Sequence, residues 1–139
     1  KDSIKVWGFW NILGEEAFGR PSEEEIRPWY WAWSLMCRYF PKGCDINAVE
    51  LTGSGEVRAC AAESDGRHTV AVVNWSSEDV QISMQVPYTF LNASVYVYEE
   101  SGAYRDAEGS LVPSLTGICG DAVSVNVPAQ SLTVITDMQ

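Results

Sequence analysis

Residues 79–86 read DVQISMQV, and this stretch decides the fold of the chain. Every second residue, beginning with Val80, is apolar, and the residues between them are polar. Successive side chains of a β-strand point to opposite faces, so this period indicates a strand that is buried on one face only. Residues 122–127 repeat the pattern, with valines that alternate with Ser124 and Asn126. Both segments are typical of an antiparallel sheet with one side facing solvent.

Further segments on either side of this stretch have the length and composition of short strands. Asp65-Gly66 separates two of them and predicts a tight hairpin of the primed type, in which both central residues have positive φ. The Gly-rich residues 101–121 predict a long hairpin excursion. Together these features indicate a mainly β fold, an antiparallel β-sandwich of about seven or eight strands. The predicted strands are 46–51, 56–63, 67–75, 79–86, 94–100, 122–127 and 131–136.

The first 45 residues follow a different pattern. Residues 4–12, IKVWGFWNI, are apolar on both faces, which is typical of a strand covered on two sides. After a loop, residues 28–39, PWYWAWSLMCRY, have helical length and are apolar nearly all round, and Pro41 follows them. Both elements need more apolar neighbours than this chain supplies. We therefore interpret residues 1–45 as the last βα unit of a larger α/β body, and residues 46–139 as the sandwich.

The charge of the chain excludes some classes of partner. The 139 residues carry a formal net charge of −10, with 19 acidic and nine basic residues. Phosphate backbones and anionic membrane surfaces attract basic patches, so we expect neither nucleic acid nor membrane as a partner. The acidic excess fits neutral or cationic ligands, or solubility alone. The chain begins with Lys1 and lacks the pattern of a secretory leader, so we expect a mature product or an excised fragment.

The cysteine and histidine content gives no sign of a metal or cofactor site. The spacings of Cys37, Cys44, Cys60 and Cys119 do not include CxxC, and His68 is the only histidine. We therefore expect no zinc site, no redox pair and no cofactor. Four cysteines allow three pairings, among which the sequence does not choose. Buried free thiols are the expected state.

Short catalytic motifs are also missing from the sequence. It contains no G-x-S-x-G nucleophile elbow and no Gly-rich phosphate loop. Triplets that begin at Asn74 and Asn92 match the N-glycosylation pattern, which matters only in a eukaryotic secretory context.

Three stretches together resemble the C-terminal end of a clan of retaining glycoside hydrolases. They are GFWNILGEE at 8–16, RPWYWAWSLMCRYFPKG at 27–43 and PAQSLTVITDM at 128–138. Enzymes of this clan are (β/α)₈ barrels followed by a β-sandwich. The resemblance covers essentially the whole chain, and it implies that residues 1–45 are the last strand and helix of the barrel.

The resemblance implies a chain that is not an enzyme on its own. Retaining hydrolysis needs two carboxyl groups about 5–5.5 Å apart. In the clan these groups lie at the ends of the fourth and seventh barrel strands, so both would precede this chain and no catalytic residue is expected here. The partner is then an upstream (β/α)₈ catalytic domain that the sandwich buttresses, and an N-terminal strand of the parent sometimes joins the sandwich. Such enzymes are commonly exported by bacteria, which implies a secreted or cell-surface location.

The same resemblance suggests two substrate-binding residues in the parent enzyme. Trp10 would end the eighth barrel strand, where active sites of barrels lie, and its indole could stack on a sugar; the alternative is a core residue. Glu15, like Glu16, follows on a loop and could bind sugar hydroxyls, although solvated loop acids are the simpler interpretation. The same simpler interpretation holds for Glu99 and Glu100.

Two other functions stay open at the level of sequence. The chain could be an independent carbohydrate-binding module with an aromatic surface, or a structural sandwich that mediates contacts between domains. On one strand, Tyr96 and Tyr98 share a face opposite Val95 and Val97. Large aromatic residues are rarely exposed in groups, so packing under a loop or a neighbouring domain is the alternative. If the aromatic helix is separated from its barrel, it could also pair with a second copy of the chain in a dimer. The candidate platform residues are Tyr88, Phe90, Tyr96, Tyr98 and Tyr104.

Overall fold

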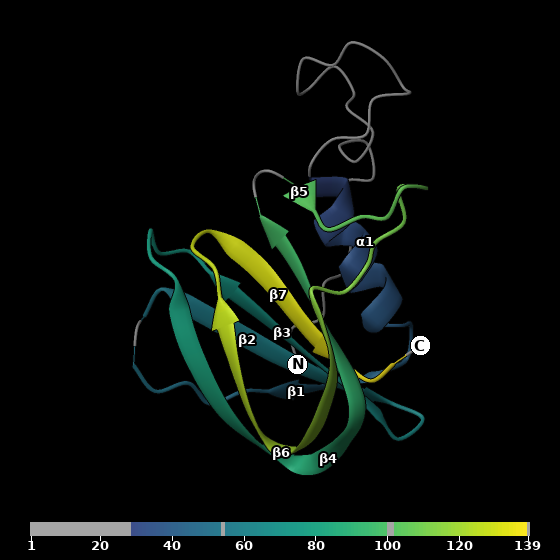
Figure 1. Cartoon of the computed structure of the whole chain (residues 1–139). Helices are drawn as coiled ribbons and strands as arrows, with labels where there is room; N and C mark the ends of the chain where they lie inside the picture. The colour runs from purple at the N-terminus through teal and green to yellow at the C-terminus, as the bar shows by residue number, and fades with distance from the viewer. Residues whose placement is uncertain (1–28, 54, 100–101, 139) are drawn as a thin grey trace.

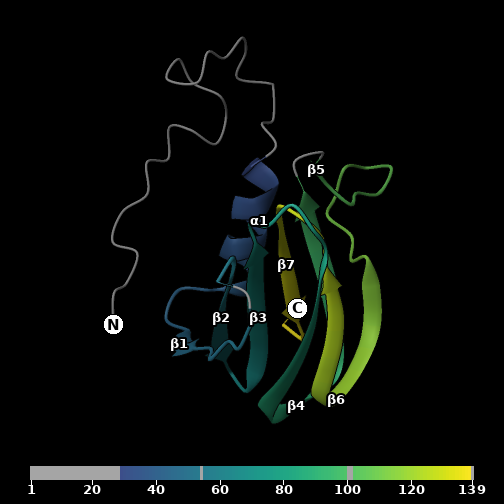
Figure 2. The same ribbon diagram turned by 90° about the vertical axis from the view of Figure 1, so that its left-hand side faces the viewer.

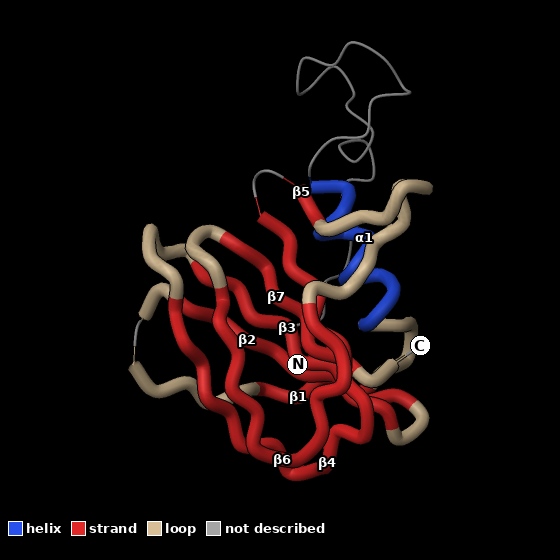
Figure 3. The backbone as a smooth tube through the Cα atoms, viewed as in Figure 1, coloured by secondary structure: helices blue, strands red, loops and turns tan. Residues whose placement is uncertain are grey.

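The computed structural model describes residues 29–53, 55–99 and 102–138. Within these residues the chain forms one helix and seven strands, and all the strand pairs are antiparallel (Figures 1 and 3). The mainly β, antiparallel fold predicted from the sequence is confirmed. The elements are α1 (Trp29–Tyr39), β1 (Asp45–Ala48), β2 (Val57–Ser64), β3 (Arg67–Asn74), β4 (Val80–Glu99), β5 (Gly102–Ala103), β6 (Leu115–Val127) and β7 (Ser131–Thr136).

The sheet folds over on itself because one strand runs through both of its layers. The strand order is β1-β2-β3-β7-β4-β5, and β6 pairs with β4 outside this path. The first part of β4 pairs with β6, from Val80 opposite Val127. Its last part pairs with β7, from Ser94 opposite Thr136. Figure 2 shows the β4–β6 ribbon on one side and β2 and β3 on the other.

The main core lies between these two layers. Valines of β2 and β3 meet apolar side chains that the curved β4–β6 ribbon directs inward. Phe90 and Val127 are completely buried there. The alternating residues of 79–86 and 122–127 supply the inward side chains, as the period of two predicts. The buried members of this cluster are Val57, Val70, Val72, Val86, Phe90, Ala93, Val95, Val97, Val123, Val125, Val127 and Ile135.

The helix covers the opposite face of the β3–β7 part of the sheet. Leu35 and Tyr39 of α1 form a second buried cluster with Ala71 of β3 and with Leu132 and Val134 of β7. Because β7 is covered on both faces, all six of its residues are buried.

The helix predicted at residues 28–39 is therefore present, and it packs on the sandwich. The predicted strand at 4–12 lies outside the described residues. The division of the chain at residue 45 stays a prediction.

Two strand predictions differ from the structure. Residues 79–86 and 94–100 were expected as separate strands, but β4 is continuous from Val80 to Glu99. The register between β4 and β6 shifts three times after Gln85, and Pro87 falls in the first of these irregular stretches, where no ladder partner is needed. The predicted hairpin excursion at 101–121 is also wrong in its last third, because β6 already begins at Leu115.

The predicted hairpin at Asp65-Gly66 is confirmed. Asp65 has φ of 52° and Gly66 has φ of 69°, and the flanking pair is Ser64 opposite Arg67. Positive φ at both central residues matches the right-handed twist of the two strands. This turn fixes the register of β2 against β3 over their full length.

Candidate interface around helix α1

The inner face of α1 is formed by residues three or four positions apart. Leu35 and Tyr39 are buried, and Ala32, Met36 and Phe40 pack beside them. Residues at this spacing lie on one face of a helix, so the sequence itself directs them toward the sheet. The helix is thereby fixed to the sandwich by apolar contacts.

Tyr39 and Tyr96 join the helix to the outer face of β4. Their ring centroids lie 5.0 Å apart, with a tilt of 35° between the planes. Burial, followed by the hydrogen bond with Tyr96, raises the pKa of Tyr39 to about 12. The Tyr39 hydroxyl is therefore neutral at physiological pH and serves as a structural hydrogen-bonding group. The nearby Arg38 guanidinium, 6.0 Å from the Tyr39 ring centroid, acts in the opposite direction on this pKa.

A second row of side chains runs along α1 beside the inner face. It consists of Tyr30, Trp33 and Cys37, again spaced by three and four residues, and we call it the outer row. None of the three belongs to the buried cluster between α1 and the sheet. Tyr30 is half-buried and Cys37 is exposed. The row thus consists of two half-buried aromatic side chains and one exposed thiol.

A loop residue secures the first turns of the helix. The guanidinium carbon of Arg105 lies 5.0 Å from the centroid of the Trp31 ring, a distance at which a cation–π contact forms. Trp31 also meets Tyr30 edge-to-face, with ring centroids 5.1 Å apart and planes at 82°. The segment after β5 therefore contributes to the position of α1.

The five candidate platform aromatics do not gather on one surface. Tyr96 and Tyr98 pack on the helix side, and Phe90 lies in the main core. Tyr88 is half-buried, and Tyr104 is the exposed member, with 56% of its surface accessible. The predicted alternation along β4 is confirmed, because Val95 and Val97 take the opposite face. Tyr96 packs, as the alternative interpretation expects, but its partner is Tyr39 of α1 and not a loop or a neighbouring domain.

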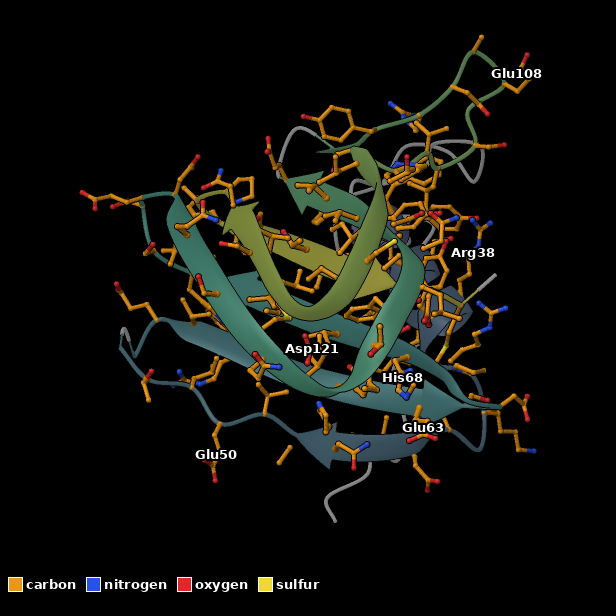
Figure 4. All side chains as sticks on the ribbon, turned by 60° about the horizontal axis from the view of Figure 1, so that its bottom comes forward. Arg38, Glu50, Glu63, His68, Glu108 and Asp121 are labelled. Carbon is orange, nitrogen blue, oxygen red and sulfur yellow. The ribbon has the colours of Figure 1, made fainter. Side chains whose placement is uncertain are left out.

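His68 and Tyr88 form a compact polar arrangement near the β2–β3 hairpin. Their rings stack with centroids 3.6 Å apart and planes at 9°. Nε2 of His68 lies 3.9 Å from a carboxylate oxygen of Glu63, and Figure 4 shows the two side chains close together. Burial, with the negative charges of Asp137 and Glu63, raises the pKa of Tyr88 to about 12. A stacked imidazole whose Nε2 has one distant carboxylate partner is a structural contact.

The substrate-binding residues predicted for the parent enzyme stay predictions. Trp10, Glu15 and Glu16 lie outside the described residues, and so does Glu100. Glu99 is half-buried at the end of β4. Among the described residues no group of three His, Cys, Asp or Glu side chains could hold a metal ion. In the same part of the chain, no helix has the length and apolar character to cross a membrane.

All four cysteines are free thiols in the structure. Cys44 and Cys60 are half-buried, and burial raises the pKa of the Cys60 thiol. The expectation of buried thiols is wrong for Cys37 and Cys119, which are exposed. Cys119 lies in the irregular part of β6, where its Sγ is 3.0 Å from the carbonyl oxygen of Leu91. Cys37 is exposed on the outer row of α1.

A cleft of ≈ 430 Å³ opens beside the last turn of α1. Arg38 of the helix, Arg67 of β3, Asn92 and Ser94 of β4, and Asp137 after β7 contribute to its walls. Sequence reasoning missed this site, because its residues are far apart along the chain and share no motif. The only signal in the sequence is that basic residues are few. Two of them line this cleft.

The fold has counterparts among solved structures, although no family model and no curated protein matches the sequence. A GH30 endoxylanase from Clostridium papyrosolvens C71 has a TM-score of 0.65 and 14% identity, covering 82% of this chain and 28% of that chain. The family 30 subfamily 8 xylanase Xyn30A from Clostridium acetobutylicum has a TM-score of 0.63 and 15% identity, covering 89% and 30%. For the catalytic domain of GH30 xylanase C from Talaromyces cellulolyticus the values are 0.50 and 17%, covering 76% and 23%.

The chain has a fold found within these glycoside hydrolases. It spans less than a third of each of the three enzymes. The resemblance that the sequence indicated is thereby confirmed at the level of the fold.

Proposed function

We propose that this chain is the non-catalytic C-terminal β-sandwich domain of a glycoside hydrolase, and that it buttresses a (β/α)₈ catalytic barrel. One observation carries the proposal: the fold likeness covers most of this chain but less than a third of each enzyme. The greater part of such an enzyme would lie outside these 139 residues. In the parent, Trp10 and Glu15 would border the sugar site.

The outer row of α1 is the surface that would meet the barrel. Tyr30 and Trp33 are large aromatic residues, a type enriched where two protein surfaces meet. The inner face of the same helix is fixed on the sheet by Leu35 and Tyr39. A helix held on one side and covered on the other would transmit contacts between the two domains.

Activity measurements test the non-catalytic part of this proposal. The 139-residue chain and a chain extended upstream to include a barrel would be assayed on xylan by release of reducing sugar. We expect turnover only by the extended chain, because the two carboxyl groups of a retaining site would both lie upstream. Turnover by the 139 residues alone would refute the non-catalytic assignment. An extended chain that contained no barrel would refute the parentage.

Substitution of exposed cysteines tests the interface itself. Cys37→Glu places a charge on the outer row, whereas Cys119→Glu places one on the exposed part of β6. Burial of an unpaired charge between domains is costly, so Cys37→Glu should lower the Tm of the extended chain by several degrees. In the 139-residue chain both variants should change Tm little, because surface substitutions usually do. Equal effects of Cys37→Glu in the two chains would contradict the proposed interface.

The outer row could instead pair with a second copy of the chain. Size-exclusion chromatography with light scattering would detect such a dimer, and Cys37→Glu should dissociate it. In the extended chain the barrel would cover this surface, so we expect a monomer there. A dimer that persists in the extended chain would place the barrel contact elsewhere.

The alternative of an independent carbohydrate-binding module has less support. Such a module needs a group of accessible aromatic side chains, whereas Tyr96 and Tyr98 pack beneath α1 and Tyr104 is exposed alone among the candidates. Affinity electrophoresis in gels that contain xylan or other polysaccharides separates the two functions. We expect the chain and its Tyr104→Ala variant to migrate equally in these gels. Retardation abolished by Tyr104→Ala would favour the module.

A further inference from the structure

A large and highly exposed aromatic side chain lies on the turn after β3. Trp75 has 68% of its surface accessible, against 56% for Tyr104. Its ring has no hydrogen bond, ring contact or cation–π contact with any residue that the structure describes. Single exposed apolar residues are common on protein surfaces. Trp75 differs from them in how firmly its main chain is held.

The main chain around Trp75 is fixed from two sides. The N–H of Trp75 donates to the carbonyl oxygen of Glu56, just before β2, at 3.0 Å. The next N–H, that of Ser76, donates to Oδ1 of the buried Asn74 side chain at 3.0 Å. The carbonyl oxygen of Ser76 accepts the N–H of Gln130, from the turn between β6 and β7, at 3.2 Å. The indole is therefore carried on an ordered turn, which lowers the entropic cost of binding a ligand.

The surface beside the indole is polar and acidic. The two turns joined here, residues 75–79 and 128–130, contain two carboxylates and no basic residue. Negative charge disfavours phosphates and acidic sugars as ligands. Charged residues are also depleted in the cores of protein–protein interfaces, so a protein partner fits this surface poorly. The exposed polar residues of the two turns are Ser77, Glu78, Asp79 and Gln130.

We infer that the Trp75 turn, residues 75–79, binds a neutral polysaccharide. An indole has an apolar face and a polar edge, which match the C–H face and the hydroxyl groups of a neutral pyranose. The carboxylate of Glu78 can accept hydrogen bonds from sugar hydroxyls, and the Ser77 hydroxyl and Gln130 amide can both donate and accept them. One indole makes a weak site, but a polysaccharide offers the same ring many times. The inference does not depend on the proposed barrel partner.

Titration of the 139-residue chain with xylohexaose and with cellohexaose, followed by NMR, tests the site. We expect shifts of the indole N–H of Trp75 and of the main-chain N–H groups of Ser76 and Ser77, with a Kd of about 1 mM for at least one of the two sugars. Trp75→Ala should weaken binding by about tenfold or more, followed at Ser76 and Ser77, because it removes the stacking surface. Tyr104→Ala is the matched control, since it removes an exposed aromatic elsewhere and should leave the Kd unchanged.

Several results would overturn the inference. One is the absence of shifts at about 10 mM of either sugar, ten times the expected Kd. Another is equal binding by the chain and a Trp75→Ala variant whose unchanged urea midpoint shows that it is folded. A positively charged glucosamine hexamer tests the alternative of a cation on the indole and carboxylates. Tighter binding of that hexamer, weakened by salt, would assign the turn to cations instead. The barrel parentage is unaffected by any of these results, because it is tested by the extended chain.

Discussion

Asn74 holds two chain reversals together from inside the sandwich. Its side chain is only 1% exposed. Its Nδ2 donates to the carbonyl oxygens of Glu78, Val127 and Pro128 at 2.8, 3.2 and 2.9 Å. Its Oδ1 accepts the main-chain N–H and the hydroxyl of Ser76 at 3.0 and 2.8 Å. One amide thus connects the turn after β3 with the turn between β6 and β7.

Removal of this amide should be costly. We expect Asn74→Ala to lower the free energy of unfolding by about 1–3 kcal/mol, because buried carbonyl groups lose their partner. Urea denaturation measures the change. Asn92→Ala is the matched control, since Asn92 is exposed and its loss should change stability by less than about 0.5 kcal/mol. Equal losses would contradict the role of Asn74. Of the two glycosylation triplets, only that of Asn92 has its asparagine at the surface.

Asp79 makes the stability of the same region depend on pH. Hydrogen bonds from the Asn126 side chain at 3.1 Å and from the Ala129 main chain at 3.0 Å lower the pKa of its carboxyl group. A folded-state pKa below the unfolded value means stability that is present above about pH 4 and lost as pH falls through the folded pKa. Asp79→Asn should therefore reduce the fall in Tm between about pH 5 and pH 2. The exposed Asp121→Asn serves as control, and the same reduction there would contradict the assignment.

At the scale of the element, α1 is tested by its buried leucine. Leu35→Ala should lower the free energy of unfolding by about 2–5 kcal/mol, because it opens a cavity between the helix and the β3–β7 sheet. Cys37→Ala, two residues on and exposed, should have little effect. Urea denaturation followed by the β-sheet circular dichroism signal measures both. If Leu35→Ala left the free energy of unfolding unchanged, the helix would not be part of the cooperative folding unit.

Elements with a regular period could be predicted from the sequence, and irregular ones could not. The valines of 122–127, the hairpin at Asp65-Gly66 and the strand at 131–136 all follow simple rules of alternation or turn chemistry, and all are present. The middle of β4 and the start of β6 contain bulges, which interrupt the alternation. Gly117 and Gly120, both with positive φ, mark these breaks and made β6 resemble a loop.

A site whose residues come from elements far apart along the chain could not be predicted from the sequence, for a similar reason. A period describes neighbours along one element, whereas the arginine cleft joins Arg38 and Arg67 across a helix and a strand. The predictions for Trp10 and Glu15 rest on the resemblance alone. That Tyr96 packs could be predicted, but its partner could not, because a residue pattern does not determine how α1 lies on the sheet.

At the scale of the whole molecule, the shared strand predicts cooperative unfolding. Since β4 pairs with both β6 and β7, neither layer can separate while the other stays intact. Far-ultraviolet and near-ultraviolet circular dichroism should therefore give the same midpoint in urea within error. The double variant Leu35→Ala/Asn74→Ala should shift both midpoints together. Two separated transitions would show that the layers unfold independently.

The bulges of β4 also determine where the chain can change in length. One additional residue between 80 and 85 would exchange inward and outward side chains along that part of the strand and turn its apolar residues toward water. Between 86 and 93 the register of β4 against β6 is already irregular. The local bend could therefore accommodate an additional residue there. In related chains, insertions and deletions within this strand should therefore concentrate at the bend.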